Sequence, residues 1–348
     1  MKKDSVDIFC AVSRGEIGKV KSWLIPSLAK QLNIGKINLT LINFTGKGSV
    51  YDGESEVGKV SIKEIRGNRQ FGFGESHNFA FKTVKPKNYF LIINPDCSLH
   101  QKCIENLIFQ MESDAKVGIV EGRQLPFEHP KEYDTKTCET PWASGACILI
   151  RSSIFEKVKG FDEHFWMYVE DVDFSWRVWL EDYKVVYCPL AVVYHYTGIY
   201  FGYNGTRYNI EHLWSARNFI YIMYKYWGRR GEKKAIKLFR RAGYPDYFCK
   251  QVFQEYGELK HSLGNDNFRL LRIKAKNKRL SLVAISHFET VKRLTIRLRR
   301  KFIPIKIRKF FQLFLNILLK QMGGNSSLKK IKVLKYGQYH TLKEKNNG

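Results

Sequence analysis

The chain has 348 residues, of which 44% are hydrophobic and 14% aromatic, so it can bury a sizeable core, and its length suggests about two domains. This composition argues against disorder. The seven cysteines are odd in number and lack metal-site spacing, which favours reduced thiols in a cytosolic protein over a disulfide framework. The N-terminus leads straight into a strand-like stretch, and no apolar run reaches the roughly 18 residues that cross a bilayer. We expect a chain that is cytoplasmic or held on a membrane surface.

The net charge of +26 is unevenly distributed. Residues 260–348 contain 23 Lys or Arg against three acids, a net +20, which leaves +6 for the first 259 residues. Such asymmetry indicates two regions of different character. We predict an α/β domain at residues 1–225 and a basic, mostly helical C-terminal region at 226–348.

Apolar runs alternate with helical patterns up to about residue 200, which is typical of an α/β domain with a mostly parallel sheet flanked by helices. The pattern predicts strands at 6–12, 39–44, 89–93, 117–120, 146–150, 183–187 and 192–196. It predicts helices at 20–31, 101–111, 174–182 and 209–227.

Residues 291–320 contain ten basic residues and no acid. Polar residues recur every four positions from Arg308 to Lys320 between apolar ones, and Pro304 divides the segment into two predicted helices. Basic amphipathic helices suit an anionic membrane surface. Two alternatives are packing on the rest of the chain with a solvated basic face, and nucleic-acid binding, for which no recognised motif is present. We therefore expect no nucleic-acid partner.

Three carboxylates lie within four residues at Glu170, Asp171 and Asp173, among aromatic residues that suggest a packed wall. Burying such groups is costly, so a cluster of this kind normally binds a cation or moves a proton. The alternative is that these acids open the helix predicted at 174–182 and complement its dipole.

Two further motifs have the residue types of a ligand site. Gly72 and Gly74 precede a helical pattern that contains Asn78, so the backbone can approach a ligand and present amides to phosphate, although an ordinary turn has the same sequence. Asn94-Pro95-Asp96 follows the strand at 89–93. Ligands collect beyond the carboxyl ends of strands in open α/β sheets, so Asp96 stands at a ligand-binding position.

The order of these motifs resembles the family 2 glycosyltransferases, particularly bacterial enzymes that build rhamnose- or galactose-containing cell-surface polysaccharides. The resemblance covers roughly residues 5–225. It rests on the glycine loop, the Asn-Pro-Asp tripeptide, and three later stretches. These are Trp142-Ala143-Ser144-Gly145-Ala146, the block from Gly160-Phe161-Asp162-Glu163 to Glu170-Asp171-Val172-Asp173, and residues 187–195.

The resemblance implies a GT-A fold that uses a nucleotide sugar and Mg²⁺ or Mn²⁺. Asp96 matches the metal ligand of the family's Asp-x-Asp element, with Asn94 as a polar neighbour. His195 matches a position that reaches the metal in some relatives, and a hydrogen-bonded histidine under a loop is the alternative. The resemblance also implies that Gly72, Gly74 and Asn78 bind the donor.

The resemblance makes Asp171 the catalytic base, which takes the proton of an acceptor hydroxyl, and a single base implies inversion at the anomeric carbon. Glu170 and Asp173 are expected to support it on the acceptor side, where Trp142, Ser144 and Gly145 form a wall. Arg177 is expected to form a structural ion pair with Asp173.

Two donor-side positions depart from the family pattern. Its first strand usually ends in a Thr-Tyr-Asn type sequence, whereas Ser13 stands here, and Asn43 replaces the aspartate that reads the base. An amide also hydrogen-bonds a uracil or thymine edge, so both residues are expected at the donor, and UDP and dTDP remain open.

The resemblance thus implies an inverting, metal-dependent transferase of rhamnose, galactose or a similar sugar. Its acceptor would be a hydroxyl of a growing lipid-linked surface glycan, such as O-antigen or capsule, at the cytoplasmic face of the bacterial inner membrane. One alternative is a nucleotide-sugar pyrophosphorylase, whose glycine-rich Thr-Arg segment residues 14–18 do not reproduce. Another is a non-enzymatic basic protein that binds membrane or nucleic acid.

Overall fold

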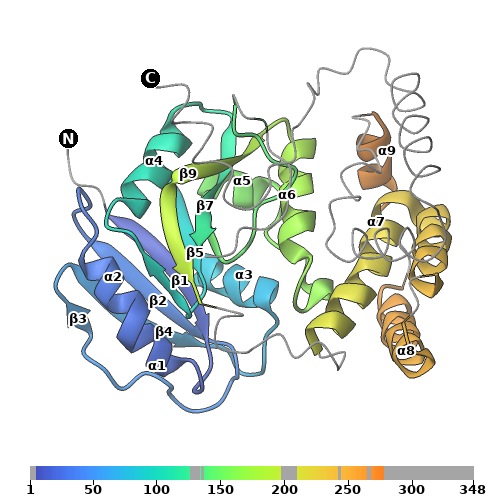
Figure 1. Cartoon of the computed structure of the whole chain (residues 1–348), viewed down its shortest axis with the longest axis horizontal. Helices are drawn as coiled ribbons and strands as arrows, with labels where there is room; N and C mark the ends of the chain where they lie inside the picture. The colour runs from blue at the N-terminus through green and yellow to red at the C-terminus, as the bar shows by residue number, and fades with distance from the viewer. Residues whose placement is uncertain are drawn as a thin grey trace, which may run out of the picture. The chain divides into compact units, whose positions relative to one another are not determined.

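The computed structural model describes residues 5–125, 134, 137–196, 210–241, 244–264 and 268–277 (Figure 1). The basic helices predicted at 291–320 lie outside these residues. The described chain divides into a unit that ends at Asn218 and a unit that begins at Phe219, within one long helix, α7 (Ile210–Arg240). The domain assignment with a boundary at residue 225 stays a prediction.

The first unit contains a sheet of nine strands among the described residues, in the order β3-β4-β2-β1-β5-β8-β7-β9-β6. The strands are β1 (Val6–Val12), β2 (Ile37–Asn43), β3 (Glu56–Val57), β4 (Val60–Arg66), β5 (Tyr89–Ile93), β6 (Cys97–Leu99), β7 (Val117–Leu125), β8 (Cys147–Arg151) and β9 (Lys184–His195).

The sheet is mixed, which corrects the expectation of a mostly parallel one. Strands β4, β2, β1 and β5 are parallel to one another, and β9 is parallel to β7. Strand β8 runs antiparallel to both of its neighbours, β5 and β7, while β3 and β6 pair antiparallel at the edges. The parallel half brings the carboxyl ends of β1, β2 and β5 to one edge of the sheet, where a ligand site is expected.

Helices cover both faces of this sheet (Figure 1). The first unit contains α1 (Ile17–Lys19), a π-helical stretch η1 (Val20–Leu24), α2 (Ile25–Ala29), α3 (Phe73–Val84), α4 (Cys103–Glu112), α5 (Ser152–Lys157), a 3₁₀ turn η2 (Glu163–Phe165), α6 (Glu170–Leu180) and the start of α7.

The alternation of side chains along β1 shows how the layers form. Ile8 and Cys10 point into the core under η1, α2 and α4, while Phe9 points into the opposite core with residues of α3, α5 and α6. This period of two is what a strand buried on both faces requires. Burial of each large apolar side chain contributes about 1.5–3 kcal/mol.

The two strands predicted at 183–187 and 192–196 form the single strand β9. Its register against β7 shifts between Gly122, which pairs with Cys188, and Arg123, which pairs with Val192. A β-bulge at this point bends the strand and carries its end toward β6. His195 is therefore delivered to the edge of the sheet beside Cys97.

The second unit contains the rest of α7, α8 (Asp246–Ser262) and α9 (Arg269–Asn277). Glu232 of α7 accepts hydrogen bonds from Tyr256 (3.0 Å) and Lys260 (2.6 Å) of α8, which fastens these two helices together. Gly228 kinks α7 at a φ of 59°. No helix within the described residues is both long and apolar enough to span a membrane.

Candidate active site

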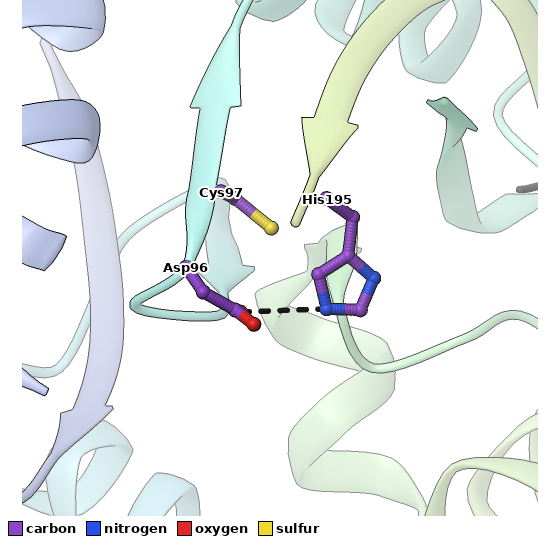
Figure 2. Close-up of side chains that lie close together, drawn as sticks. All are labelled: Asp96, Cys97 and His195. Carbon is purple, nitrogen blue, oxygen red and sulfur yellow. Dashed lines mark ion pairs between the residues drawn. The ribbon is translucent and has the colours of Figure 1, made fainter. Parts of the chain in front are cut away.

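Asn94 and Asp96 follow the last residue of β5 and meet His195 at the end of β9. Asp96 Oδ1 lies 3.4 Å from His195 Nε2, and Asn94 Nδ2 lies 3.5 Å from the same nitrogen. Figure 2 shows the Asp96 carboxylate directed at the imidazole ring. The pairing of β6 with β9 places Cys97 opposite His195, so backbone hydrogen bonds fix this approach.

The chemistry of this cluster fits a divalent cation. Asp96, Cys97 and His195 each offer a ligand atom, and these atoms lie within 4.8 Å of one another. Burial, followed by the negative charge of Asp96, raises the pKa of Cys97 well above its ordinary value, and hard cations such as Mg²⁺ prefer oxygen to sulfur ligands. Two ligands of one octahedral ion lie about 3 Å apart, which matches the Asp96 and His195 separation. The carboxylate suits both Mg²⁺ and Mn²⁺, whereas an imidazole nitrogen is an unusual ligand for Mg²⁺, which prefers oxygen.

A residue that the sequence did not reveal orients His195. The Nδ1 of His195 lies 2.9 Å from Oε1 of Gln124, a buried residue near the end of β7. An amide oxygen only accepts, so Nδ1 of the imidazole carries a hydrogen, and Nε2 is the ring nitrogen that faces Asp96. Metal-binding histidines are commonly oriented in this way by a second residue.

Asp171 lies in the first turn of α6, which begins at Glu170, four residues before the predicted start. The backbone amide of Gly145 donates to Asp171 Oδ2 (3.0 Å), and that of Val172 donates to Oδ1 (2.8 Å). The Asp171 side chain remains half-buried. All three acids lie in the first helical turn, so the helix-start interpretation of the cluster describes their location correctly.

Two adjacent residues connect Asp171 with the end of β5. The amide of Gly145 donates to Asp171, while the carbonyl of Ala146 accepts from the amide of Asn94 (3.0 Å). A Cβ on Gly145 would lie 2.9 Å from a ring carbon of Phe73, so a side chain there would push into α3. The carboxylate of Asp171 and the Asn94–Asp96 turn are thus tied to the same short piece of backbone.

The other two acids of the cluster are buried. Glu170 is 5% exposed and its Oε2 has no hydrogen-bond partner. Burial, and then the negative charges of Asp171 and Asp173, raise the pKa of Glu170 well above its ordinary value. Glu170 therefore holds its proton to a higher pH than an ordinary carboxyl group, and Asp171 is the most exposed of the three carboxyl groups.

Asp173 has no exposed surface and forms the predicted ion pair with Arg177 at 2.7 Å. Arg177 also donates from Nη1 to the carbonyls of Val158 and Gly160, each at 2.6 Å. This network holds the turn before the Phe161 segment. Asp173 is fully buried in this network, and its contact with an acceptor stays a prediction.

The glycines at the start of α3 allow close approach to protein backbone. A Cβ on Gly72 would lie 2.3 Å from the carbonyl oxygen of Trp166, and that oxygen accepts from the amide of Phe73 (2.7 Å). A Cβ on Gly74 would lie 2.7 Å from Cβ of Phe161. These contacts are with the segment that leads to α6. A role for the glycines toward the donor stays a prediction.

Asn78 also binds the segment before α6. Its Nδ2 donates to the carbonyl of Phe161 (2.9 Å) and to Glu163 (3.0 Å), and its Oδ1 accepts from the amide of Phe161 (2.8 Å). Each end of the amide is therefore used within the protein. The structure gives Asn78 a clamping role, and its contact with the donor stays a prediction.

Ser13 and Asn43 shape the turns that follow β1 and β2. The amide and hydroxyl of Ser13 donate to Glu16 at 2.9 and 2.7 Å. Asn43 is fully buried, and its Nδ2 lies within 3.0 Å of the carbonyls of Lys47 and Gly48 and of Glu64 Oε1. The amide expected to read the base is thus engaged with its own loop, and both donor contacts stay predictions.

The stretch from Trp142 to Ala146 lies beside Asp171, as the Gly145 contact shows. The Ser144 amide donates to the buried carboxylate of Glu121 (3.1 Å), and its hydroxyl accepts from Ala146 (3.4 Å). Trp142 is half-buried, so part of its indole remains available. Contact of this wall with an acceptor stays a prediction.

Residues 54–174 match the family model described as "Glycosyl transferase family 2". This part, about a third of the chain, is thus similar to the family 2 glycosyltransferases. The match includes the turn with Asp96 and the Asp171 region, and it ends within α6.

Curated proteins similar to parts of this chain include two bacterial enzymes. One is the N-acetylglucosaminyl-diphospho-decaprenol L-rhamnosyltransferase of Mycobacterium tuberculosis, 47% identical over 55 residues, which are 16% of this chain and 18% of that protein. The other is the O-antigen chain rhamnosyltransferase RfbN of Salmonella typhimurium, 27% identical over 188 residues, or 48% and 59% of the two chains. The matches thus span less than two thirds of these relatives.

A solved structure resembles the chain over most of its length. It is the mannosyltransferase PcManGT of Pyrobaculum calidifontis in complex with GDP-Man and Mn²⁺, with a TM-score of 0.51 and 12% identity, over 85% of this chain and 86% of that one. At this identity the likeness concerns the fold. The GT-A fold expected from the sequence is confirmed.

Proposed function

We propose that this chain is an inverting, metal-dependent glycosyltransferase. It moves a sugar such as rhamnose or galactose from a UDP- or dTDP-sugar to a hydroxyl of a growing lipid-linked surface glycan, such as O-antigen or capsule. The observation that carries the proposal is the link through Gly145 and Ala146. This link ties Asp171 to the turn of Asn94 and Asp96, which supports transfer between a donor held at that turn and an acceptor beside Asp171.

The donor end of the site would be organised by Asp96 and His195, with Asn94 beside them. These residues would hold Mg²⁺ or Mn²⁺, and the bound cation would neutralise charge on the departing nucleoside diphosphate. Gln124 keeps the imidazole in the tautomer that offers Nε2. The solved structure of PcManGT, which has a similar fold, contains GDP-Man and Mn²⁺, and this supports a nucleotide sugar and a divalent cation as ligands.

Asp171 is the proposed base. Its two carboxylate oxygens are oriented by the amides of Gly145 and Val172, and its half-buried side chain leaves room for an acceptor hydroxyl. As the hydroxyl oxygen attacks the anomeric carbon from the side opposite the diphosphate, its proton passes to Asp171. Buried Glu170 and Asp173 are poorly placed to act as a second nucleophile, so one displacement with inversion follows.

The acceptor assignment draws on the relatives. Both are named as rhamnosyltransferases, one toward a diphospho-decaprenol glycan and one toward O-antigen. On this basis we place Trp142 at the acceptor side, where an indole face stacks on a sugar ring. The basic residues 291–320 would bring the chain to the anionic cytoplasmic face of the bacterial inner membrane as a peripheral protein.

Nucleotide release tests the proposal. Purified protein is mixed with UDP- and dTDP-sugars, Mg²⁺ or Mn²⁺ and a lipid-linked acceptor, and free UDP or dTDP is measured. We expect release that depends on both metal and acceptor. Asp171→Asn should abolish turnover while calorimetry still detects donor binding, because the amide keeps the shape but takes up no proton.

Three results would contradict the proposal. One is the absence of release from every donor, under conditions in which a sister enzyme turns over. Another is release of pyrophosphate from a nucleoside triphosphate and a sugar 1-phosphate, which would indicate a pyrophosphorylase. The third is an Asp171→Asn variant with full activity, which would exclude this carboxylate as the base.

A further inference from the structure

The loop before Asp171 has an unusual backbone. Trp166, Tyr168 and Val169 have φ angles of 61°, 68° and 78°, in the region that favours glycine. Each such residue costs about 1–3 kcal/mol and persists where its surroundings hold it. Val169 is β-branched, among the residue types least suited to this conformation, and it stands directly before α6. Other parts of the chain must therefore hold this loop.

Two buried side chains at the start of α7 hold the loop through its carbonyl groups. Asn218 is fully buried, and its Nδ2 lies within hydrogen-bond distance of three loop carbonyl oxygens. These belong to Phe165 (2.8 Å), Met167 (2.8 Å) and Tyr168 (2.6 Å). Arg217 donates from Nη2 to the carbonyls of His164 (2.6 Å) and Phe165 (2.9 Å).

Arg217 and Asn218 also bind one another, since Nε of Arg217 donates to Oδ1 of Asn218 at 2.8 Å. The Arg217 guanidinium lies over the ring of Trp214, 4.7 Å from its centroid. Both side chains are thus fixed before they reach the loop. A donor pair held in this way imposes a defined position on the carbonyls that it binds.

The loop in turn fixes the start of α6. Asp171 follows Val169 by two residues, and the carbonyl of Val169 accepts from the amide of Asp173 (3.0 Å). On its other side the loop is bound to α3, since the Trp166 carbonyl accepts from Phe73. A shift of the loop would therefore move Asp171 away from the amide of Gly145, which lies 3.0 Å from its carboxylate.

We propose that Arg217 and Asn218 are positioning residues that set the place of Asp171 through the carbonyls of residues 164–168. This inference rests on the proposed function, in which Asp171 is the base. Neither side chain needs to touch a substrate. Misplacement of a reacting group by about 1 Å costs on the order of 100-fold in rate, so the hold on the loop is a requirement of catalysis.

The test compares Asn218→Ala and Arg217→Met with a control on the same helix, Ser215→Ala. Arg217→Met keeps an apolar stem near Trp214, so it replaces Asn218→Ala if that variant fails to fold. Turnover, binding of UDP and dTDP by calorimetry, and hydrogen exchange of single backbone amides are measured for each protein. The Gly145 amide reports directly on Asp171, because Asp171 accepts its hydrogen bond.

In both variants we expect kcat to fall by about 100-fold while the Kd for the nucleotide stays within twofold. The Gly145 amide should exchange at least about tenfold faster, with unchanged exchange in the central strands β1 and β5. Ser215→Ala should match the unmodified protein in every measurement. The selective change at Gly145 separates positioning from general loss of stability.

Unchanged exchange at Gly145, or faster exchange spread evenly through β1 and β5, would overturn the inference. A normal kcat in either variant would also overturn it. If the unmodified protein transfers no sugar at all, the proposed function fails. In that case the exchange measurement still decides whether Arg217 and Asn218 place Asp171.

Discussion

Substitution of Glu170 by glutamine should make the protein less sensitive to rising pH. Glu170 is buried beside Asp171 and Asp173, and its pKa is raised well above the ordinary 4.5. In the unfolded chain the same carboxyl loses its proton near pH 4.5, whereas in the folded chain it keeps the proton. Between pH 4.5 and the folded pKa, folding therefore binds a proton at this position.

The sign and size of the effect follow from this difference. Since the folded state binds the extra proton, the contribution of Glu170 to stability is fully present below pH 4.5 and is lost as pH rises toward its folded pKa. The slope for one proton is about 1.4 kcal/mol per pH unit. Over two pH units between 4.5 and the folded pKa, Glu170→Gln should gain about 3 kcal/mol relative to the unmodified protein.

Urea unfolding at a series of pH values between 4.5 and 8 measures this gain. The fixed cost of a buried amide shifts the whole curve of the variant, so the slope of the difference against pH is the decisive quantity. Glu112→Gln, at an exposed position, controls for the loss of one carboxylate. A difference that does not change with pH, or that falls as pH rises, would show that Glu170 is ionised in the folded protein and refute the reasoning.

Two further substitutions test contacts of the site. Gly72→Ala should lower the free energy of unfolding by about 2–4 kcal/mol, because its Cβ would lie 2.3 Å from the Trp166 carbonyl. Gly15→Ala, where no atom lies within 4 Å, should change it by less than about 0.5 kcal/mol in the same urea series, and equal losses would contradict the contact. Gln124→Met should weaken Mn²⁺ binding about 10- to 100-fold by calorimetry, whereas Gln124→Glu, which still accepts from His195, should retain it. Equal affinities in both variants would exclude an orienting role.

Much of the fold followed from apolar runs. The strand at 89–93 was predicted with its observed bounds, and the strand at 6–12 likewise. Strand β4 was missed because Lys63, Glu64 and Arg66 interrupt its apolar alternation, while its pairing with β2 supplies the missing stability. The sequence of β4 alone does not indicate that β2 will pair with it.

In the site, too, residues marked by their sequence neighbours could be predicted, whereas a residue that depends on a distant partner could not. Asp96 and Asp171 were marked by turns and by charge clustering, both visible in a short window. Gln124 stands near the end of an ordinary strand, and its relevance arises from His195, 71 residues away. Gly72 correctly signalled a close backbone approach, but the sequence does not state whether the approaching group is a ligand or, as observed, the Trp166 carbonyl.

The backbone of Gly145 and Ala146 limits the distance between two hydrogen-bonded parts of the site. The Gly145 amide is hydrogen-bonded to Asp171 and the Ala146 carbonyl to Asn94. Two residues of backbone span no more than about 7 Å. Substitutions of the surrounding side chains do not alter the length of this backbone segment, because covalent geometry sets it. A substitution that changes only the surrounding side chains therefore leaves unchanged the spacing between the hydrogen bonds to Asp171 and Asn94.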